Sequence, residues 1–160
     1  MDTPGWLSDE EYDFVFDRVP RLCVDLVIKS EKGILLSLRD IEPYEGLWHL
    51  PGGMVYKDEP IHSAIKRIAQ KETGLEIRVN HFLGYMEFLH AIQNNHNRHM
   101  VSIVFDTYPI DANIKPKKDF QAKKIEFHSF LPENIVTQHQ NLLIDHKLLT
   151  FQNQVPPNPV

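Results

Sequence analysis

The chain has 160 residues, of which 42% are hydrophobic and 24% charged, a length and composition that predict one globular domain. The formal net charge of −5 provides no basic excess for non-specific nucleic-acid binding. The single cysteine, Cys23, excludes an internal disulfide, and no apolar run approaches the roughly 18 residues of a membrane helix. We therefore expect a cytoplasmic protein with neither a nucleic-acid nor a membrane partner.

The first elements are predicted from a capping box and two apolar runs. Ser8 and Glu11 form a Ser-x-x-Glu box, which predicts a short acidic helix over 8–17. Residues 21–29 predict a buried strand that contains Asp25, and residues 34–38 predict its hairpin partner, which Arg39 ends. Asp25 is open to two interpretations, a hydrogen bond to nearby backbone or a contact with substrate.

The central segment, residues 48–75, predicts a strand, a turn at Gly52-Gly53 and a helix that ends at Gly74. Pro60 is expected at the first helical position. Apolar residues recur at helical spacing from Ile61 to Ala69, and the next position on this inward face is Glu72. A carboxylate on an inward face predicts a charged partner, because burial of an unpaired charge is costly.

The rest of the chain predicts strands over 76–80, 81–90, 99–108 and 122–129, with a possible bulge at Gly84 and a polar loop over 91–98. A helical section is expected over 132–149, with Ile144 and the neighbouring leucines facing inward, and then a proline-rich tail over 152–160. Strands on both sides of a helix predict a mixed α/β (α+β) fold. We expect a single domain over 1–160, with its core at about 20–150.

The spacing of Gly53, Glu59, Arg67, Glu72 and Gly74 resembles the Nudix box, with two of its clustered glutamates replaced by Ile68 and Lys71. The resemblance covers roughly residues 22–149 and implies an α-β-α sandwich with a mixed sheet. It gives Gly53, Glu59, Arg67 and Gly74 structural roles, with Glu59 and Arg67 bracing the loop against the helix.

Further positions are similar to GDP-mannose mannosyl hydrolase-like proteins, a Nudix subfamily with the same broken box: Asp25, Arg39 and the segment from Trp48 to Gly53. This resemblance implies hydrolysis of a nucleotide sugar such as GDP-mannose, a small-molecule substrate, by a homodimer. It implies one Mg²⁺ ion held by Gly52, Glu72 and Gln121, with Arg39 on the diphosphate and Asp25 at the substrate. Oxygen ligands of this kind suit magnesium.

Three departures from the subfamily concern its reaction. Ala122 stands in place of the histidine base, Met54 in place of an arginine that balances leaving-group charge, and Met100 in place of a strand tyrosine. Loss of a general base costs about 10²- to 10⁴-fold in rate. His99 is a candidate replacement, whereas His62, His128, His139 and His146 are expected to be surface or helix residues without a role. The alternatives are an ordinary Nudix pyrophosphohydrolase that attacks phosphorus and a catalytically weak nucleotide-sugar-binding module.

Overall fold

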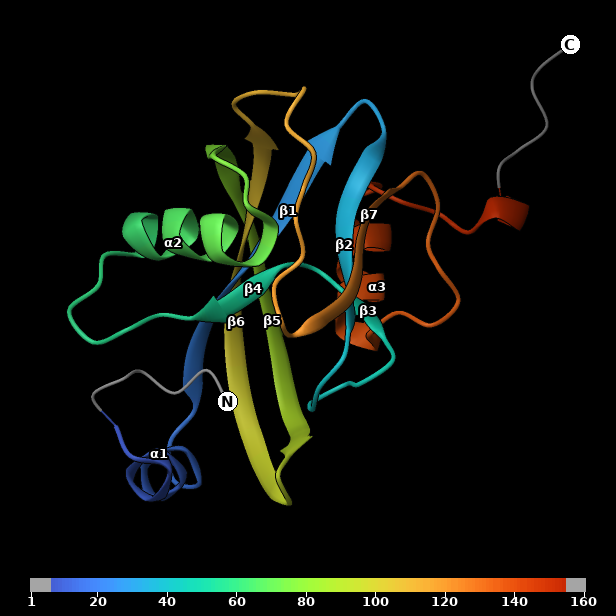
Figure 1. The fold of residues 1–160 in the computed structure, drawn as a ribbon. Coiled ribbons are helices and arrows are strands. Elements are labelled where there is room, and N and C mark those ends of the chain that lie inside the picture. Colours follow the sequence, from blue (N-terminus) through green and yellow to red (C-terminus); the bar gives the residue numbers. More distant parts are fainter. Residues whose placement is uncertain (1–6, 155–160) are drawn as a thin grey trace, which may run out of the picture.

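The computed structural model describes residues 7–154, and its centre is a mixed sheet with strand order β3-β2-β1-β6-β5. The long strands are β1 (Arg21–Ser30), β2 (Gly33–Arg39), β5 (Ile77–Gln93), β6 (His96–Pro109) and β7 (Ala122–His128). The two short strands are β3 (Trp48–His49) and β4 (Gly52–Met54). β1 pairs in parallel with β6 and antiparallel with β2 and β4, whereas β7 pairs with β2 (Figure 1).

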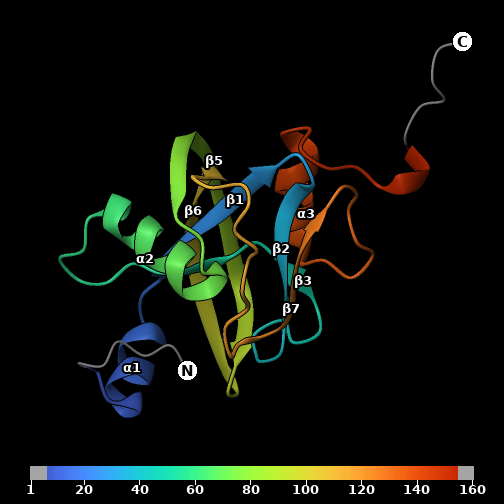
Figure 2. The ribbon, with the colours of Figure 1, turned by 45° about the horizontal axis from the view of Figure 1, so that its top comes forward.

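The helices are α1 (Asp9–Phe16), α2 (Ile61–Thr73) and α3 (Thr137–Asp145), with a 3₁₀ turn at Gln152–Gln154. Side chains of β1 alternate between two cores, because successive residues of a strand point to opposite faces. Val24, Leu26 and Ile28 pack with the apolar side of α2. Cys23 and Val27 belong to the core that contains Leu142 and Leu143 of α3. The ribbon places α2 and α3 on opposite sides of β1 (Figures 1 and 2). The fold is thus the expected α-β-α sandwich.

The central helix forms as the sequence predicts. Ala64, Ile65, Ile68 and Ala69 are buried, and Gly74 ends α2 in a left-handed conformation with φ of 67°. Glycine adopts this conformation without steric cost, which favours it after the last helical turn. Pro60 is the N-cap and not the first helical residue. The capping box of α1 is also formed, since the Ser8 side chain accepts a hydrogen bond from the Glu11 N–H.

Several predicted elements are wrong in their boundaries. Gly52 and Gly53 are part of strand β4 and not a turn. Residues 77–93 form one strand with irregular register, including the expected shift at Gly84, and the hairpin loop is only Asn94-Asn95. The helical section begins at Thr137 instead of 132 and ends at Asp145, and Ile144 is 38% exposed. Of the predicted tail over 152–160, residues 155–160 lie outside the described residues. None of the described helices is both long and apolar enough to cross a bilayer.

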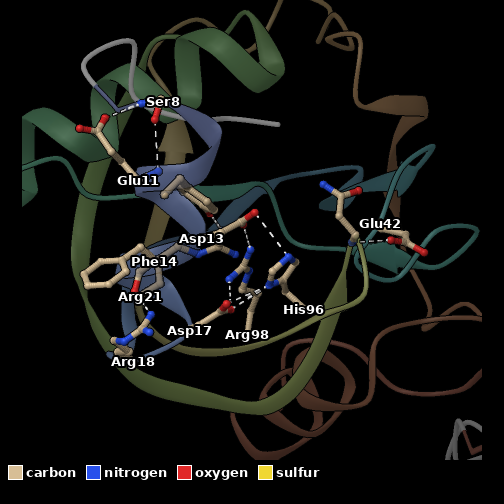
Figure 3. A network of polar contacts seen from close by, with 12 residues as sticks. Ser8, Glu11, Asp13, Phe14, Asp17, Arg18, Arg21, Glu42, His96 and Arg98 are labelled. Carbon is tan, nitrogen blue, oxygen red and sulfur yellow. Dashed lines mark hydrogen bonds and ion pairs between the residues drawn. The ribbon is translucent and has the colours of Figure 1, made fainter.

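The N-terminal helix is fastened to the β5–β6 hairpin by charge. Arg98 of β6 has only 1% of its surface exposed and pairs with Asp13 and Asp17 of α1. His96 contacts the same two carboxylates, with its Nδ1 2.9 Å from Asp17 (Figure 3). A buried arginine with two carboxylate partners positions α1 beside the first residues of β1.

Candidate active site

A cavity of about 120 Å³ lies on the face of β1 that carries Cys23 and Asp25. It is bordered by the loop between β2 and β3, by β4 and by one residue each of α2 and α3. Polar and charged side chains of this cavity come from eight separate parts of the chain: Arg21, Asp25, Arg39, His49, Glu72, Gln93, Ser102, Gln121 and His139. The predicted residues Asp25, Arg39, Gly52, Glu72 and Gln121 therefore share one cavity.

Gly52 is required at the cavity because its neighbour on β1 occupies the space of a side chain. Gly52 lies opposite Asp25, and a Cβ atom on Gly52 would be 2.1 Å from the Asp25 Oδ1. The Gly52 N–H donates to Glu72 Oε2 at 3.0 Å, away from β1. Because the N–H and C=O of a strand residue point to the same side, the Gly52 carbonyl also faces the side of Glu72.

Glu72 lies at the last turn of α2, where the inward stripe meets β4. Burial raises the pKa of its carboxyl to about 8, although the hydrogen bond from Gly52 opposes this shift. A carboxyl with so high a pKa is poorly compensated by the protein alone. Glu72 therefore fits a site that is completed by a cation.

Arg39 and Gln121 are brought together by the pairing of β2 with β7. Arg39 lies opposite Ala122, and the Asp40 N–H donates to the Gln121 carbonyl at 2.8 Å. Arg39 donates to the carbonyls of Ile41 and Glu42, both at 3.2 Å, so its guanidinium has no carboxylate in these hydrogen bonds. The Gln121 Nε2 is buried without a hydrogen-bond partner among the described residues.

The residues present fit one magnesium ion. A backbone carbonyl, a carboxylate and a side-chain amide provide oxygen ligands, which Mg²⁺ prefers, and few protein ligands leave room for water and phosphate. The poorly compensated carboxyl of Glu72 favours a cation at this point. The unpartnered Nε2 of Gln121 is a hydrogen-bond donor, which suits an acceptor such as a phosphate oxygen beside the ion. Within residues 7–154, no group of three or more His, Cys, Asp or Glu side chains is placed to hold a metal ion.

Asp25 forms a buried cluster with Ser102 and His139. Ser102 donates a hydrogen bond to Asp25 Oδ2, and His139 Nε2 is 4.0 Å from Oδ1. Burial raises the pKa of Asp25 to about 7 and lowers that of His139 to about 3. The His139 Nδ1 accepts the Leu50 N–H at 2.8 Å, so the single proton of the neutral ring is on Nε2 and faces Asp25.

His139 was expected to be a surface or helix residue without a role; it does lie on α3, but only 4% of it is exposed and it lines the cavity. His49, on β3, also lines the cavity. Its Nδ1 is 2.6 Å from the Leu50 carbonyl, and burial lowers its pKa well below the usual value. His49 is thus neutral, with Nδ1 as donor and Nε2 as an available acceptor.

His99 does not lie at the cavity. It lies on β6 between Arg98 and Met100, whereas Met100 and Ser102, which point to the opposite face of the strand, line the cavity. The His99 Nε2 is 3.6 Å from Glu87 Oε1. Its expected role as a replacement base is therefore not retained. Ala122 is 97% buried at the start of β7, where it offers no proton acceptor on its side chain.

Glu59 and Arg67 hold the loop before α2 against the helix. The Arg67 guanidinium donates to both oxygens of Glu59 at 2.7 Å and to the Met54 carbonyl at 2.8 Å. Glu59 also accepts the Tyr56 N–H at 3.0 Å. The hydrogen bonds from Arg67 lower the pKa of Glu59, so this carboxylate is ionised and occupied by structural contacts.

The sequence matches known proteins over most of its length. Residues 19–147 match the model of the NUDIX domain. A low-salt glycan biosynthesis protein, Agl8, of Haloferax volcanii is 32% identical over 112 residues, which are 68% of this chain and 72% of that protein. An ADP-ribose pyrophosphatase of Methanocaldococcus jannaschii is 32% identical over 129 residues, 79% of this chain and 73% of that protein.

Solved structures share the fold. A MutT NUDIX hydrolase from Burkholderia pseudomallei superposes with a TM-score of 0.69 at 23% identity, covering 79% of this chain and 98% of that one. A bifunctional NMN adenylyltransferase/ADP ribose pyrophosphatase from Francisella tularensis, solved with AMP and a manganese ion, has a TM-score of 0.58 at 22% identity. The match covers 86% of this chain and 47% of that one. At these identities the likeness establishes the arrangement of helices and strands.

Proposed function

The chain belongs to the Nudix hydrolase family, and from this premise we propose that it hydrolyses nucleotide sugars, such as GDP-mannose, with one Mg²⁺ ion. The observation that carries the proposal is the shared cavity of Arg39, Gly52, Glu72 and Gln121. A diphosphate needs cationic groups and a metal, and an attached sugar needs polar groups beside them. The cavity offers both in one place.

The metal ligands in this proposal are the Gly52 carbonyl, the Glu72 carboxylate and the Gln121 amide. A magnesium ion bound there would neutralise the diphosphate and improve it as a leaving group. Ile68 and Lys71 replace two glutamates of the usual box, and both lie on α2 with Glu72. One ion is therefore the expected number.

The protein side chains have separate roles. Arg39 binds diphosphate oxygens, because its planar guanidinium matches two of them at once. Asp25 faces the same cavity and accepts hydrogen bonds from sugar hydroxyls, while Ser102 and His139 hold its carboxyl in place. Tyr44 and Phe88, whose ring centres are 6.0 Å apart, form an apolar part of the cavity wall.

The two relatives favour different bonds. The glycan biosynthesis protein of Haloferax volcanii supports a nucleotide-sugar substrate. The ADP-ribose pyrophosphatase of Methanocaldococcus jannaschii favours the second candidate, attack at phosphorus by an ordinary Nudix pyrophosphohydrolase. The loss of glutamates at Ile68 and Lys71 weighs against the second candidate, since it removes ligands for further ions. Ala122 and Met54 keep open a third candidate, a binding module with little turnover.

The test is a panel of nucleotide sugars incubated with enzyme and Mg²⁺, with products identified by mass spectrometry. Release of a nucleoside diphosphate and a free sugar supports the proposal, and no turnover of any compound refutes it. Reaction in ¹⁸O-labelled water separates the candidates, because carbon attack labels the sugar and phosphorus attack labels phosphate. Tight binding without turnover identifies a binding module. The cytoplasmic location and the homodimer that the resemblance implies remain proposals, which cell fractionation and sedimentation analysis test.

A further inference from the structure

Arg21 is a second guanidinium at the cavity, in addition to Arg39. It is the first residue of β1 and lies on the same strand face as Cys23 and Asp25, because alternate residues of a strand share a face. On the neighbouring strand β6 its direct partner is Met100, which also lines the cavity. The backbone therefore directs Arg21 toward the space that holds Asp25.

Arg21 has no acidic partner within the described residues. Its guanidinium contacts the hydroxyl of Tyr12 and the sulfur of Met100, and its buried Nε makes no hydrogen bond. The nearby carboxylates of α1, Asp13 and Asp17, are held by Arg98 and His96 (Figure 3). Arg21 is half-buried, and a partly buried arginine normally has an anion beside it.

The two arginines act on each other across the cavity. Burial lowers the pKa of Arg39, Glu72 opposes this shift, and the positive charge of Arg21 lowers the pKa further. Arg39 itself donates to backbone carbonyls. Two guanidinium groups that line one small cavity repel each other, and an anion placed between them removes this repulsion.

We propose that Arg21 and Arg39 form a clamp that binds the substrate diphosphate from two sides. The inference rests on the proposed function and extends it, since it assigns a diphosphate-binding role to a residue outside the Nudix box. Charged hydrogen bonds from two guanidinium groups favour a ligand with two phosphate groups over a ligand with one.

The position of Met54 supports this assignment. Met54 lies opposite Cys23, so Arg21 is its diagonal neighbour on the same face of the sheet, within reach of a long side chain. Met54 and Met100 both line the cavity and carry no charge, so Arg21 supplies the positive charge on this part of its wall.

The test is calorimetric titration of the full chain with Mg²⁺ and either inorganic pyrophosphate or orthophosphate. We expect pyrophosphate to bind the native protein more tightly, and Arg21→Met to weaken pyrophosphate binding by about 10- to 100-fold. Orthophosphate binding falls by much less. Arg21→Lys retains a positive charge but lacks the planar guanidinium, so its pyrophosphate affinity should lie between those of the native protein and Arg21→Met.

Tyr12→Phe is the matched control, because it removes the contact of Arg21 with α1 and keeps the guanidinium. It should change pyrophosphate affinity less than twofold, with folding of every variant checked by circular dichroism. The clamp is refuted if native protein binds no pyrophosphate, if folded Arg21→Met binds it as tightly, or if Tyr12→Phe causes an equal loss. If Arg21→Met does not fold, an unchanged affinity of Arg21→Lys refutes it.

The outcomes also separate the clamp from the proposed function. Native protein that binds pyrophosphate but hydrolyses no nucleotide sugar contradicts the function and leaves the clamp in place. Native protein that hydrolyses a nucleotide sugar, with kcat/KM and pyrophosphate affinity both unaffected by Arg21→Met, contradicts the clamp alone.

Discussion

Replacing Glu72 by glutamine should make the metal-free protein more stable and remove its response to magnesium. The change is nearly isosteric, and the amide oxygen can still accept the Gly52 N–H that Glu72 now accepts at 3.0 Å. What the substitution removes is a carboxyl group whose pKa burial raises from 4.5 to about 8. Stability and function are thus expected to change in opposite directions.

The pH dependence gives the magnitude. Between pH 4.5 and about 8 the unfolded chain loses the Glu72 proton while the folded protein retains it, so stability falls as pH rises through this window. Each pH unit costs about 1.4 kcal/mol, which amounts to about 3 kcal/mol by pH 7. The glutamine variant lacks this loss. Its free energy of unfolding should exceed the native value by up to about 3 kcal/mol at pH 7 and equal it near pH 4.5.

The assay is urea denaturation in EDTA at several pH values, repeated at pH 7 with Mg²⁺. At a magnesium concentration about 100 times its Kd, the native protein should gain about 2.7 kcal/mol, and Glu72→Gln should gain far less. Glu76→Gln, at an exposed position just beyond α2, is the matched control. Equal pH slopes for native protein and Glu72→Gln, or equal stabilisation of both by magnesium, would refute the reasoning.

Three further substitutions test residues that border the cavity or hold its loop in place. Gly52→Ala places a Cβ atom 2.1 Å from the Asp25 Oδ1. We expect its free energy of unfolding in urea to fall by about 1–3 kcal/mol and its turnover to fall strongly. Gly53→Ala, whose Cβ has its nearest contact at 3.3 Å, should have a smaller effect in both measurements. Glu59→Gln breaks the charged pair that holds the loop against α2 and should lower the free energy of unfolding by about 1–3 kcal/mol; an unchanged Tm would contradict this role. Burial lowers the pKa of His139 from 6.5 to about 3. As pH falls through this window the unfolded chain takes up a proton on His139 and the folded protein does not, so the free energy of unfolding decreases. His139→Gln should therefore lose less stability than the native protein between about pH 6.5 and 4, as measured by thermal unfolding. An equal loss of stability in the two proteins would contradict the assigned neutral state.

The sequence was most informative where a local pattern and the tertiary structure agree. The apolar stripe of α2 placed Glu72 on the inward side, and the structure has it bonded to Gly52. The capping box and Gly74 likewise set the ends of helices by local hydrogen bonding and backbone preference. These features depend on neighbours within a few residues, which a sequence displays directly.

Other features depend on strand partners that are distant in sequence. Gly52-Gly53 has the composition of a turn but forms a strand, because β1 supplies hydrogen bonds on one side and Asp25 fills the space of a side chain. Arg21 reaches the cavity only because β1 pairs with β6, a contact between residues about eighty positions apart. No local pattern indicates either arrangement.

His139 could have been found from its own helix. It precedes Leu142 and Leu143 by three and four positions, so it shares the apolar face of α3 that packs on the sheet. A histidine on such a face is buried and needs a partner, here the Leu50 N–H. The polar composition of segment 91–98 predicted a loop, but most of these residues extend strands β5 and β6. Only Asn94 and Asn95 form the turn, and both have positive φ.

We propose that one magnesium site, built on Glu72, serves hydrolysis of a nucleotide sugar. The most direct measurement is release of a nucleoside diphosphate from a nucleotide-sugar panel with native protein and Glu72→Gln, each in Mg²⁺ and in EDTA. We expect the native protein to turn over substrate in Mg²⁺ but not in EDTA, and Glu72→Gln to lose at least about 100-fold in turnover. Turnover that persists in EDTA, or that is equal in the two proteins, would contradict it.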